Sequence, residues 1–279
     1  MPGGVLYVVA TPIGNLEDIA LRALRVLREV DLIAAEDTRH TRVLLSRHGI
    51  SRPVTSYYDA VERARAPAIV EKLKAGARVA LVSDAGTPGI ADPGYHLVRG
   101  AVAAGVPVVP VPGASAVTAL VSVAGLPAER FVFEGFLPSR PGPRAERLAA
   151  LAREPRAIVF FEAGRRLVAF LAAAHAALGD RDAAVARELT KRHEEILRGT
   201  LGELAERVSG MERVRGEVTI LVGARAAPEV PPATPDLDAR IRTARAAGRS
   251  VADLAAEIAR ETGVPRRAVY RRALALERT

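Results

Sequence analysis

The fold of this chain is decided by the stretch Val79-Ala-Leu-Val-Ser-Asp-Ala-Gly-Thr-Pro-Gly-Ile-Ala-Asp-Pro-Gly94. Its first four residues are apolar and suit a strand that is buried on both faces of a parallel sheet. The loop that follows contains three Gly and two Pro, which let the backbone itself approach a small molecule. Ligands of open parallel sheets bind at the carboxyl ends of the strands. The stretch therefore predicts a binding loop at that edge.

The same loop limits the class of ligand. It contains neither the dinucleotide pattern Gly-x-Gly-x-x-Gly nor the phosphate-loop pattern with its Gly-Lys-Ser/Thr ending, and it offers no Lys or Arg. A purely anionic ligand is therefore not indicated. The alternative is an ordinary strand-to-helix connection, although most of these are shorter, about 2–6 residues.

Length and composition indicate a globular protein with a full core. The chain has 279 residues, of which 49% are hydrophobic, enough for two domains and a small appendage. No apolar run approaches the roughly 18 residues of a membrane-spanning helix, and the N-terminus lacks the pattern of a signal peptide. We therefore expect a cytoplasmic protein without membrane contact. The chain has no Cys, and its five His are scattered, so we expect no metal site.

The charge of the chain favours a polyanionic partner. The formal net charge is +8, and such an excess is typical of proteins that bind nucleic acid. Only three of the 40 basic residues are Lys, but a compositional bias of the genome would produce the same Arg excess.

Short apolar runs alternate with amphipathic stretches up to about residue 112, which indicates βαβ units and a parallel sheet. Asn15 is predicted to cap a helix that runs through Leu27. A polar cluster follows each run, so these clusters should share one edge and form a cleft. The expected strands are residues 5–10, 32–35, 54–57, 79–82 and 106–111.

A second α/β set follows, in which the last strands look antiparallel. Its expected strands are residues 131–136, 157–161, 183–187, 194–198 and 217–222. No linker separates the two sets, so we expect them to pack together and share the cleft. The predicted organisation is an N-terminal α/β domain over 1–114, a C-terminal α/β domain over 115–225, a Pro-rich linker over 226–235 and a basic helical module over 236–279.

The tail is the most basic part of the chain. Residues 234–279 hold ten Arg against six acidic residues. Ser250 can cap one helix, Gly263 can end it, and Pro265 can begin another that runs to Leu276. The spacing of small and apolar residues fits a helix-turn-helix with Arg on its second helix, and a plain helical hairpin is the alternative.

Several longer motifs resemble the tetrapyrrole-methylase-like class of S-adenosylmethionine-dependent methyltransferases, and within it the ribosomal RNA small subunit methyltransferase I family. These motifs are residues 8–16, 35–39, 83–94, 110–116, 133–138, 160–166 and 188–191. The resemblance implies two α/β domains that form a cofactor cleft, and transfer of a methyl group to the ribose 2′-hydroxyl of a cytidine in the decoding region of small-subunit rRNA. It also implies rRNA or an assembled small ribosomal subunit as partner, and a homodimer.

The resemblance further implies which residues hold S-adenosylmethionine. Many members of the class carry Gly-Asp-Pro where this chain has Gly86-Thr87-Pro88, which leaves open whether Asp84 or a backbone carbonyl meets the charged end of the cofactor. The expected cofactor residues are Thr11, Pro12, Asp84, Ala85, Gly86, Thr87, Ile90, Ser115, Ala116, Phe161, Leu189 and Thr219.

Methyl transfer to a hydroxyl depends on positioning and gains from a base near the acceptor. Lys191 is the leading candidate because an ammonium group can lose its proton in an apolar cleft, and a surface Lys that binds phosphate is the alternative. Glu36 and Asp37 are further candidates, with helix N-terminal capping as the alternative. Residues expected to hold RNA are Arg39, Arg165, Arg266, Arg267 and Arg271. For Arg39 and Arg165, ion pairs within the protein are the alternative.

Two other functions remain open from the sequence. A methyltransferase of the same fold could act on a tetrapyrrole or another small molecule, although the basic tail argues against it. A DNA-binding regulator could instead read duplex DNA with the tail and sense a small ligand with the α/β domains.

Overall fold

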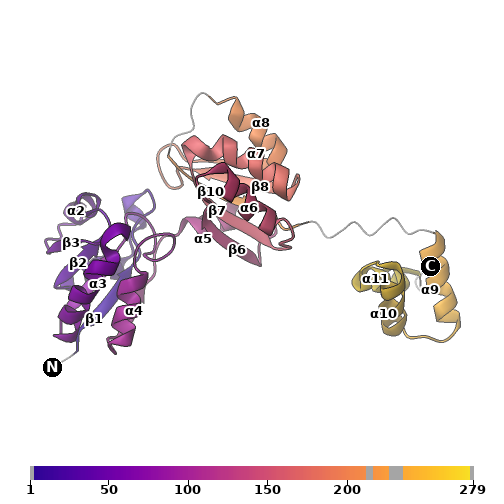
Figure 1. The fold of residues 1–279 in the computed structure, drawn as a ribbon, viewed down its shortest axis with the longest axis horizontal. Coiled ribbons are helices and arrows are strands. Elements are labelled where there is room, and N and C mark those ends of the chain that lie inside the picture. The colour runs from indigo at the N-terminus through magenta and orange to yellow at the C-terminus, as the bar shows by residue number, and fades with distance from the viewer. Residues whose placement is uncertain (1–2, 212–215, 226–234, 277–279) are drawn as a thin grey trace. The chain divides into compact units, whose positions relative to one another are not determined.

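The structure is a computed structural model that describes residues 3–211, 216–225 and 235–276. The chain divides into two compact units, Met1–Arg225 and Ala226–Thr279 (Figure 1). Except for Pro235, the expected linker at 226–235 lies outside the described residues. Within the described ranges, no helix has both the length and the apolar character needed to cross a membrane.

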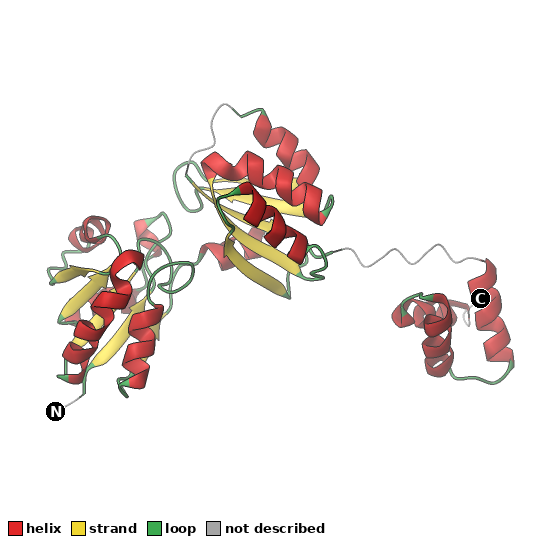
Figure 2. Ribbon diagram, viewed as in Figure 1, coloured by secondary structure: helices red, strands yellow, loops and turns green. Residues whose placement is uncertain are grey.

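The first sheet of the larger unit is parallel and has helices on both faces (Figure 2). Its strands are ordered β3-β2-β4-β1-β5, and every pairing is parallel. One face packs on α1 (Leu21–Glu29) and α2 (Thr38–Arg47), and the other on α3 (Asp59–Lys74) and α4 (Tyr95–Ala103). The strands are β1 (Val5–Val9), β2 (Leu32–Ala35), β3 (Val54–Ser56), β4 (Arg78–Val82) and β5 (Val108–Val111). The predicted βαβ organisation is confirmed.

The second sheet is mixed, with the order β6-β7-β10-β8-β9. Strands β6 and β7 are parallel, whereas β10 runs antiparallel to β7 and β8, and β9 antiparallel to β8. The predicted antiparallel arrangement of the last strands is thus confirmed. The strands are β6 (Phe131–Phe136), β7 (Ala157–Ala163), β8 (Asp182–Arg187), β9 (Glu195–Thr200) and β10 (Glu217–Val222).

The helices of this half complete two cores. One face of the sheet packs on α6 (Pro141–Leu151), α7 (Leu167–Leu178) and α8 (Leu201–Ser209). The other face packs on α5 (Ala116–Val123), and Ile13 from the loop after β1 joins the same cluster. The two halves of the larger unit therefore share apolar contacts close to the predicted cleft.

The prediction of one continuous helix from Asn15 through Leu27 is wrong, because the structure has two separate helical elements there. Asn15 caps only a single 3-10 turn, η1 (Leu16–Asp18), by accepting a hydrogen bond from the Glu17 amide at 3.1 Å. Ile19 and Ala20 are extended and pack against the core of the first sheet, and α1 begins at Leu21. Burial of these two apolar residues opposes a continuous helix.

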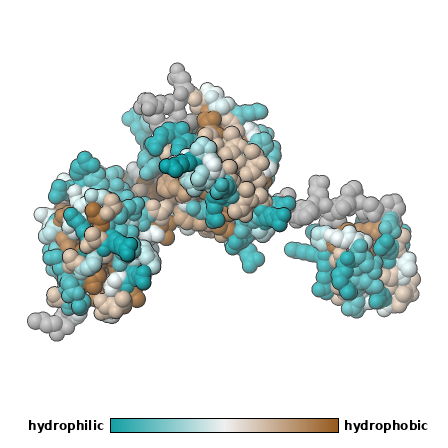
Figure 3. Space-filling model, viewed as in Figure 1, coloured by the Kyte–Doolittle hydropathy of each residue, from teal (hydrophilic) through white to brown (hydrophobic). Residues whose placement is uncertain are grey.

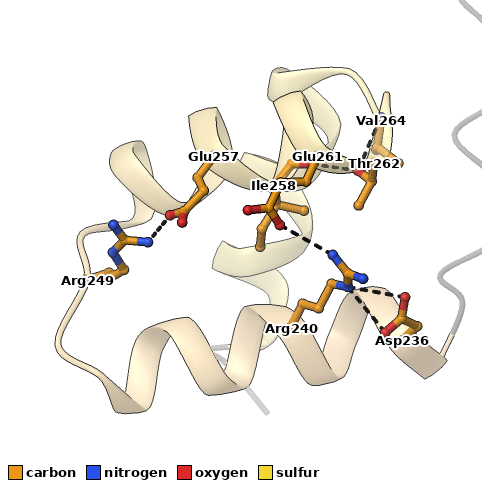
Figure 4. A network of polar contacts seen from close by, with 8 residues as sticks. All are labelled: Asp236, Arg240, Arg249, Glu257, Ile258, Glu261, Thr262 and Val264. Carbon is orange, nitrogen blue, oxygen red and sulfur yellow. Dashed lines mark hydrogen bonds and ion pairs between the residues drawn. The ribbon is translucent and has the colours of Figure 1, made fainter.

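The smaller unit holds α9 (Pro235–Ala246), α10 (Val251–Thr262) and α11 (Arg266–Leu276) around its own apolar core. Ser250 caps α10 and Gly263, in the left-handed conformation, ends it, as predicted. Arg240 pairs with Asp236 and Glu261, and Arg249 pairs with Glu257, which ties α9 and the turn after it to α10 (Figure 4). Hydrophilic residues cover much of the visible face of this unit (Figure 3).

Candidate active site

A cavity of about 240 Å³ lies where the loops that follow the strands of the first sheet meet the second sheet. The loop after β4 forms one side, and residues of β7, β10 and the β8–β9 connection form the other. Of the expected cofactor residues, the following line it: Asp84, Ala85, Gly86, Thr87, Ile90, Ser115, Ala116, Phe161, Leu189 and Thr219.

Thr11 and Pro12 lie beside this cavity, in the lining of a second one of about 340 Å³ that shares Asp84, Ala85 and Lys191 with the first. Thr11 joins the loops after β1 and β4. Its amide donates to the Gly86 carbonyl at 2.8 Å, the Gly86 amide donates to the Thr11 carbonyl at 3.1 Å, and its hydroxyl donates to the Ser83 carbonyl at 3.0 Å. Gly86 has a φ of 74°, which explains the need for glycine at this position.

Two carboxylates lock the ends of β2 and β4 together. The Asp84 amide donates to Glu36 Oε2 at 3.2 Å, and Asp84 Oδ1 accepts from the Asp37 amide at 3.0 Å. Both carboxylates line the first cavity. Their orientation is therefore fixed by backbone hydrogen bonds.

Asp37 has a different role from the one that the sequence suggests. Its carboxylate caps α2 by accepting from the Arg39 amide at 2.8 Å and also pairs with the Arg39 guanidinium at 2.8 Å. The Arg39 side chain, and next its amide, lower the pKa of Asp37 to about 2. Asp37 is absent from the lining of the described cavities. This geometry suits the capping alternative and not a base.

The first cavity is strongly acidic. Burial, followed by the charge of Glu36, raises the pKa of Asp92 to about 7, and burial likewise raises the pKa of Glu36. The carboxylates of the lining belong to Glu36, Asp84, Asp92, Glu162, Glu188 and Glu217. Sequence reasoning missed Asp92 as a site residue, although it lies inside the loop that predicts the site.

Lys191 does not lie in an apolar cleft. Its ammonium group lies 3.0 Å from Glu188 Oε1 and 3.5 Å from Glu217 Oε2. Burial alone lowers the pKa of Lys191, but the hydrogen bond to Glu188 and the charge of Glu217 outweigh it and raise the pKa. The expectation that its surroundings help Lys191 to lose a proton is therefore wrong.

The segment that carries Lys191 is closely packed. Glu188 and Thr190 have positive φ values of 50° and 63°, which is uncommon for residues other than glycine. Gly14 lies against this segment, and a Cβ atom there would lie 2.7 Å from the Leu189 carbonyl oxygen and 2.5 Å from Lys191 Cγ. The loop after β1 and the β8–β9 connection are therefore so close that only glycine fits at position 14.

None of the Arg residues expected to hold RNA is in the lining of the described cavities. Arg39 is paired with Asp37, and its side chain is 88% exposed. Arg165 is exposed in η2 (Gly164–Arg166), and the lining of the described cavities includes neither residue. In the smaller unit, Arg267 and Arg271 are exposed on α11, and Arg266 donates to the Ala252 carbonyl at 3.5 Å.

Comparison with protein families gives two matches. The model of the tetrapyrrole (corrin/porphyrin) methylases matches residues 5–205, and that of the RsmI C-terminal HTH domain matches residues 231–277. The helix-turn-helix prediction for the tail is therefore confirmed over a plain helical hairpin.

Solved structures of low identity share the fold. The methyltransferase CobJ matches with a TM-score of 0.61 and 21% identity, and the match covers 83% of this chain and 98% of the CobJ chain. Uroporphyrin-III C-methyltransferase from Thermus thermophilus, in complex with S-adenosyl homocysteine, matches with a TM-score of 0.55 and 22% identity, covering 79% of this chain and 97% of its own.

Curated relatives match over nearly the whole chain. Ribosomal RNA small subunit methyltransferase I of Mesorhizobium japonicum is 46% identical, covering 98% of this chain and 92% of the relative. The enzyme of the same name from Pseudomonas aeruginosa is also 46% identical, covering 98% of both. The chain is therefore a methyltransferase of the tetrapyrrole (corrin/porphyrin) methylase class and belongs to the ribosomal RNA small subunit methyltransferase I family.

Proposed function

We propose that this protein transfers a methyl group from S-adenosylmethionine to the ribose 2′-hydroxyl of a cytidine in the decoding region of small-subunit rRNA. The observation that carries the proposal is the acidic cavity at the carboxyl edge of the first sheet, in a chain that also has a basic helix-turn-helix unit. The 46% identity to relatives named for small-subunit rRNA supports the choice of substrate.

The residues of the cavity fit the cofactor. S-adenosylmethionine carries a sulfonium and an ammonium group, which carboxylates such as Asp84 and Glu36 attract, whereas a nucleotide phosphate would be repelled. Phe161, Leu189 and Ile13 line the same cavity and would supply apolar surface for a flat base such as adenine. When bound, the cofactor supplies its methyl group to the acceptor oxygen as the carbon–sulfur bond breaks and the sulfonium becomes a neutral thioether.

The proton of the acceptor hydroxyl must go to a base. Lys191 is held as an ammonium ion by Glu188 and Glu217, and Asp37 is held by Arg39, so neither is suited to accept it. Glu36 and Asp92 both line the cavity, and Asp92, with a pKa of about 7, has the affinity for protons that suits a base at neutral pH. We therefore assign the proton acceptor to Asp92, with Glu36 as its charged neighbour.

A tetrapyrrole substrate is the competing proposal, since the solved structures of this fold include tetrapyrrole methyltransferases. The charge of +8 and the helix-turn-helix unit favour RNA instead. The homodimer and the cytoplasmic location that we expect from the sequence stay predictions.

One experiment separates the two substrates. The purified chain is incubated with methyl-labelled S-adenosylmethionine and, in parallel, with unmethylated small ribosomal subunits or with uroporphyrinogen III. We expect label on the subunits alone. Label on the tetrapyrrole alone would overturn the proposal, and titration calorimetry with S-adenosylmethionine establishes independently that the cofactor binds.

A further inference from the structure

A third cavity, of about 810 Å³, opens beside the site and has the opposite electrostatic character. Its charged lining consists of Arg47, Lys191 and Arg192 with Glu17 as the one acid, and Asn15, His48 and Thr190 complete its polar surface. Neither the predicted RNA-binding residues nor the family motifs identified from the sequence include Arg47, His48 or Arg192. This basic cavity is therefore a feature that only the fold brings together.

Two of the three cations of the basic cavity are available to a ligand. Within residues 3–211, 216–225 and 235–276, the side chains of Arg47 and Arg192 form no hydrogen bond or ion pair, and both residues are exposed. Two further polar atoms, His48 Nε2 and Thr190 Oγ1, are buried without a hydrogen-bond partner. Buried polar atoms are normally paired, so both atoms add unused hydrogen-bonding capacity beside the cavity that their residues line.

The basic cavity adjoins the acidic one. Lys191 lines both, and it also lines the 340 Å³ cavity formed by Thr11, Pro12 and the start of α2. The acidic cavity suits the cationic cofactor, and the basic cavity suits an anion. A polynucleotide that delivers one ribose to the methyl group must place its neighbouring phosphates within a few ångströms of that ribose.

We propose that Arg47, Arg192 and His48 form a binding subsite for the RNA backbone phosphates next to the target nucleotide. Arg suits this role, because its guanidinium group can donate two parallel hydrogen bonds to a phosphate. Lys191, held between Glu188 and Glu217, marks the boundary between the phosphate subsite and the cofactor cavity. The inference rests on the proposed function, because it needs an RNA substrate.

The test uses the full chain with Arg47→Gln, with Arg192→Gln and with the control Arg153→Gln. Arg153 is also exposed and without a partner in the described residues, but it precedes β7 and so lies at the opposite edge of the second sheet from Phe161. The probe is the unmethylated small ribosomal subunit, and its affinity is measured by filter binding at several salt concentrations. The affinity for S-adenosylmethionine is measured in parallel by calorimetry.

We expect each of the two variants to weaken subunit binding about fivefold or more, and to reduce the slope of log affinity against log salt by about 0.7 for each phosphate that the variant no longer neutralises. Affinity for S-adenosylmethionine should stay at the wild-type value, and Arg153→Gln should leave both properties unchanged. If Arg47→Gln and Arg192→Gln behave like Arg153→Gln while the wild type methylates subunits, the phosphate subsite is refuted. If the wild type binds the cofactor but methylates no subunits, it is the proposed function that fails.

Discussion

Glu36 and Asp84 hold the ends of two neighbouring strands in a reciprocal arrangement of carboxylates and amides. The Asp84 amide donates to Glu36 at 3.2 Å, and the Asp84 carboxylate accepts at 3.0 Å from Asp37, the residue after Glu36. The two residues thus hold the ends of β2 and β4 together, and under the proposed function their carboxylates would also attract the cationic cofactor.

Substitution of Asp84 can separate these two roles. Asp84→Asn keeps an oxygen that accepts from the Asp37 amide but removes the charge, so folding should be retained while affinity for S-adenosylmethionine falls about fivefold. Asp84→Ala removes both the accepting oxygen and the charge, so it should also lower the free energy of unfolding by about 1–3 kcal/mol. Urea denaturation and calorimetry measure the two effects. Equal cofactor affinity in Asp84→Asn and wild type would contradict the electrostatic role.

Gly14→Ala tests the close contact between the loop after β1 and the segment that carries Lys191. The added Cβ would lie 2.7 Å from a backbone oxygen, so the two loops must move apart and distort the cavity. We expect cofactor affinity to fall about tenfold, equivalent to about 1.4 kcal/mol of overpacking. Gly142→Ala in α6 is the matched control, since a Cβ there meets nothing within 4 Å. A similar affinity in the two variants would show that the close approach at Gly14 is not needed.

The pKa of Asp92 predicts how activity depends on pH. Methyl transfer under single-turnover conditions should rise with pH through about 7 as Asp92 loses its proton. Asp92→Asn should lower this rate about 10²- to 10⁴-fold and remove that step from the profile. A variant that keeps the wild-type rate and profile would exclude Asp92 as the proton acceptor.

Asp92 also predicts a pH dependence of stability. Its pKa is raised from 3.8 to about 7 on folding, so its contribution to stability is complete below pH 3.8 and is lost as the pH rises through about 7. Asp92→Asn cannot titrate. Its Tm relative to the wild type should therefore be higher at pH 8 than at pH 5, and a Tm difference that does not change with pH would contradict the raised pKa of the half-buried Asp92.

Removal of the smaller unit tests its role in RNA binding. A chain of residues 1–225 retains both sheets and their cores, so its affinity for S-adenosylmethionine should stay within about twofold of the full chain. Its KM for small ribosomal subunits should rise, because the Arg residues of α11 are removed. The double variant Arg267→Gln and Arg271→Gln should show the same change in the full chain. An unchanged KM in the truncated chain and in the double variant would contradict a role of the smaller unit in RNA binding.

The sequence could predict the sheets because buried parallel strands and amphipathic helices leave periodic patterns. The composition of the loop over residues 83–94 likewise predicted that it would line a cavity at the carboxyl edge of the first sheet. The break after η1 was not predictable, because it depends on tertiary burial of Ile19 and Ala20.

The electrostatic character of the site was harder to predict. Glu217 reaches Lys191 only because β10 lies beside β8 in the second sheet, and no local pattern reports that register. Arg47 and Arg192 are far apart in the sequence and look like ordinary surface residues until the fold places them in one cavity. Sequence reasoning therefore located residues that line the cavity better than it located charged partners.

The most direct test of the proposed reaction is to find the methylated atom. Small ribosomal subunits that lack the modification are incubated with the chain and methyl-labelled S-adenosylmethionine, and their RNA is digested to nucleosides and analysed by mass spectrometry. We expect one product, 2′-O-methylcytidine, from a single position of the decoding region. Label on a base, or no label despite cofactor binding, would contradict the proposed reaction.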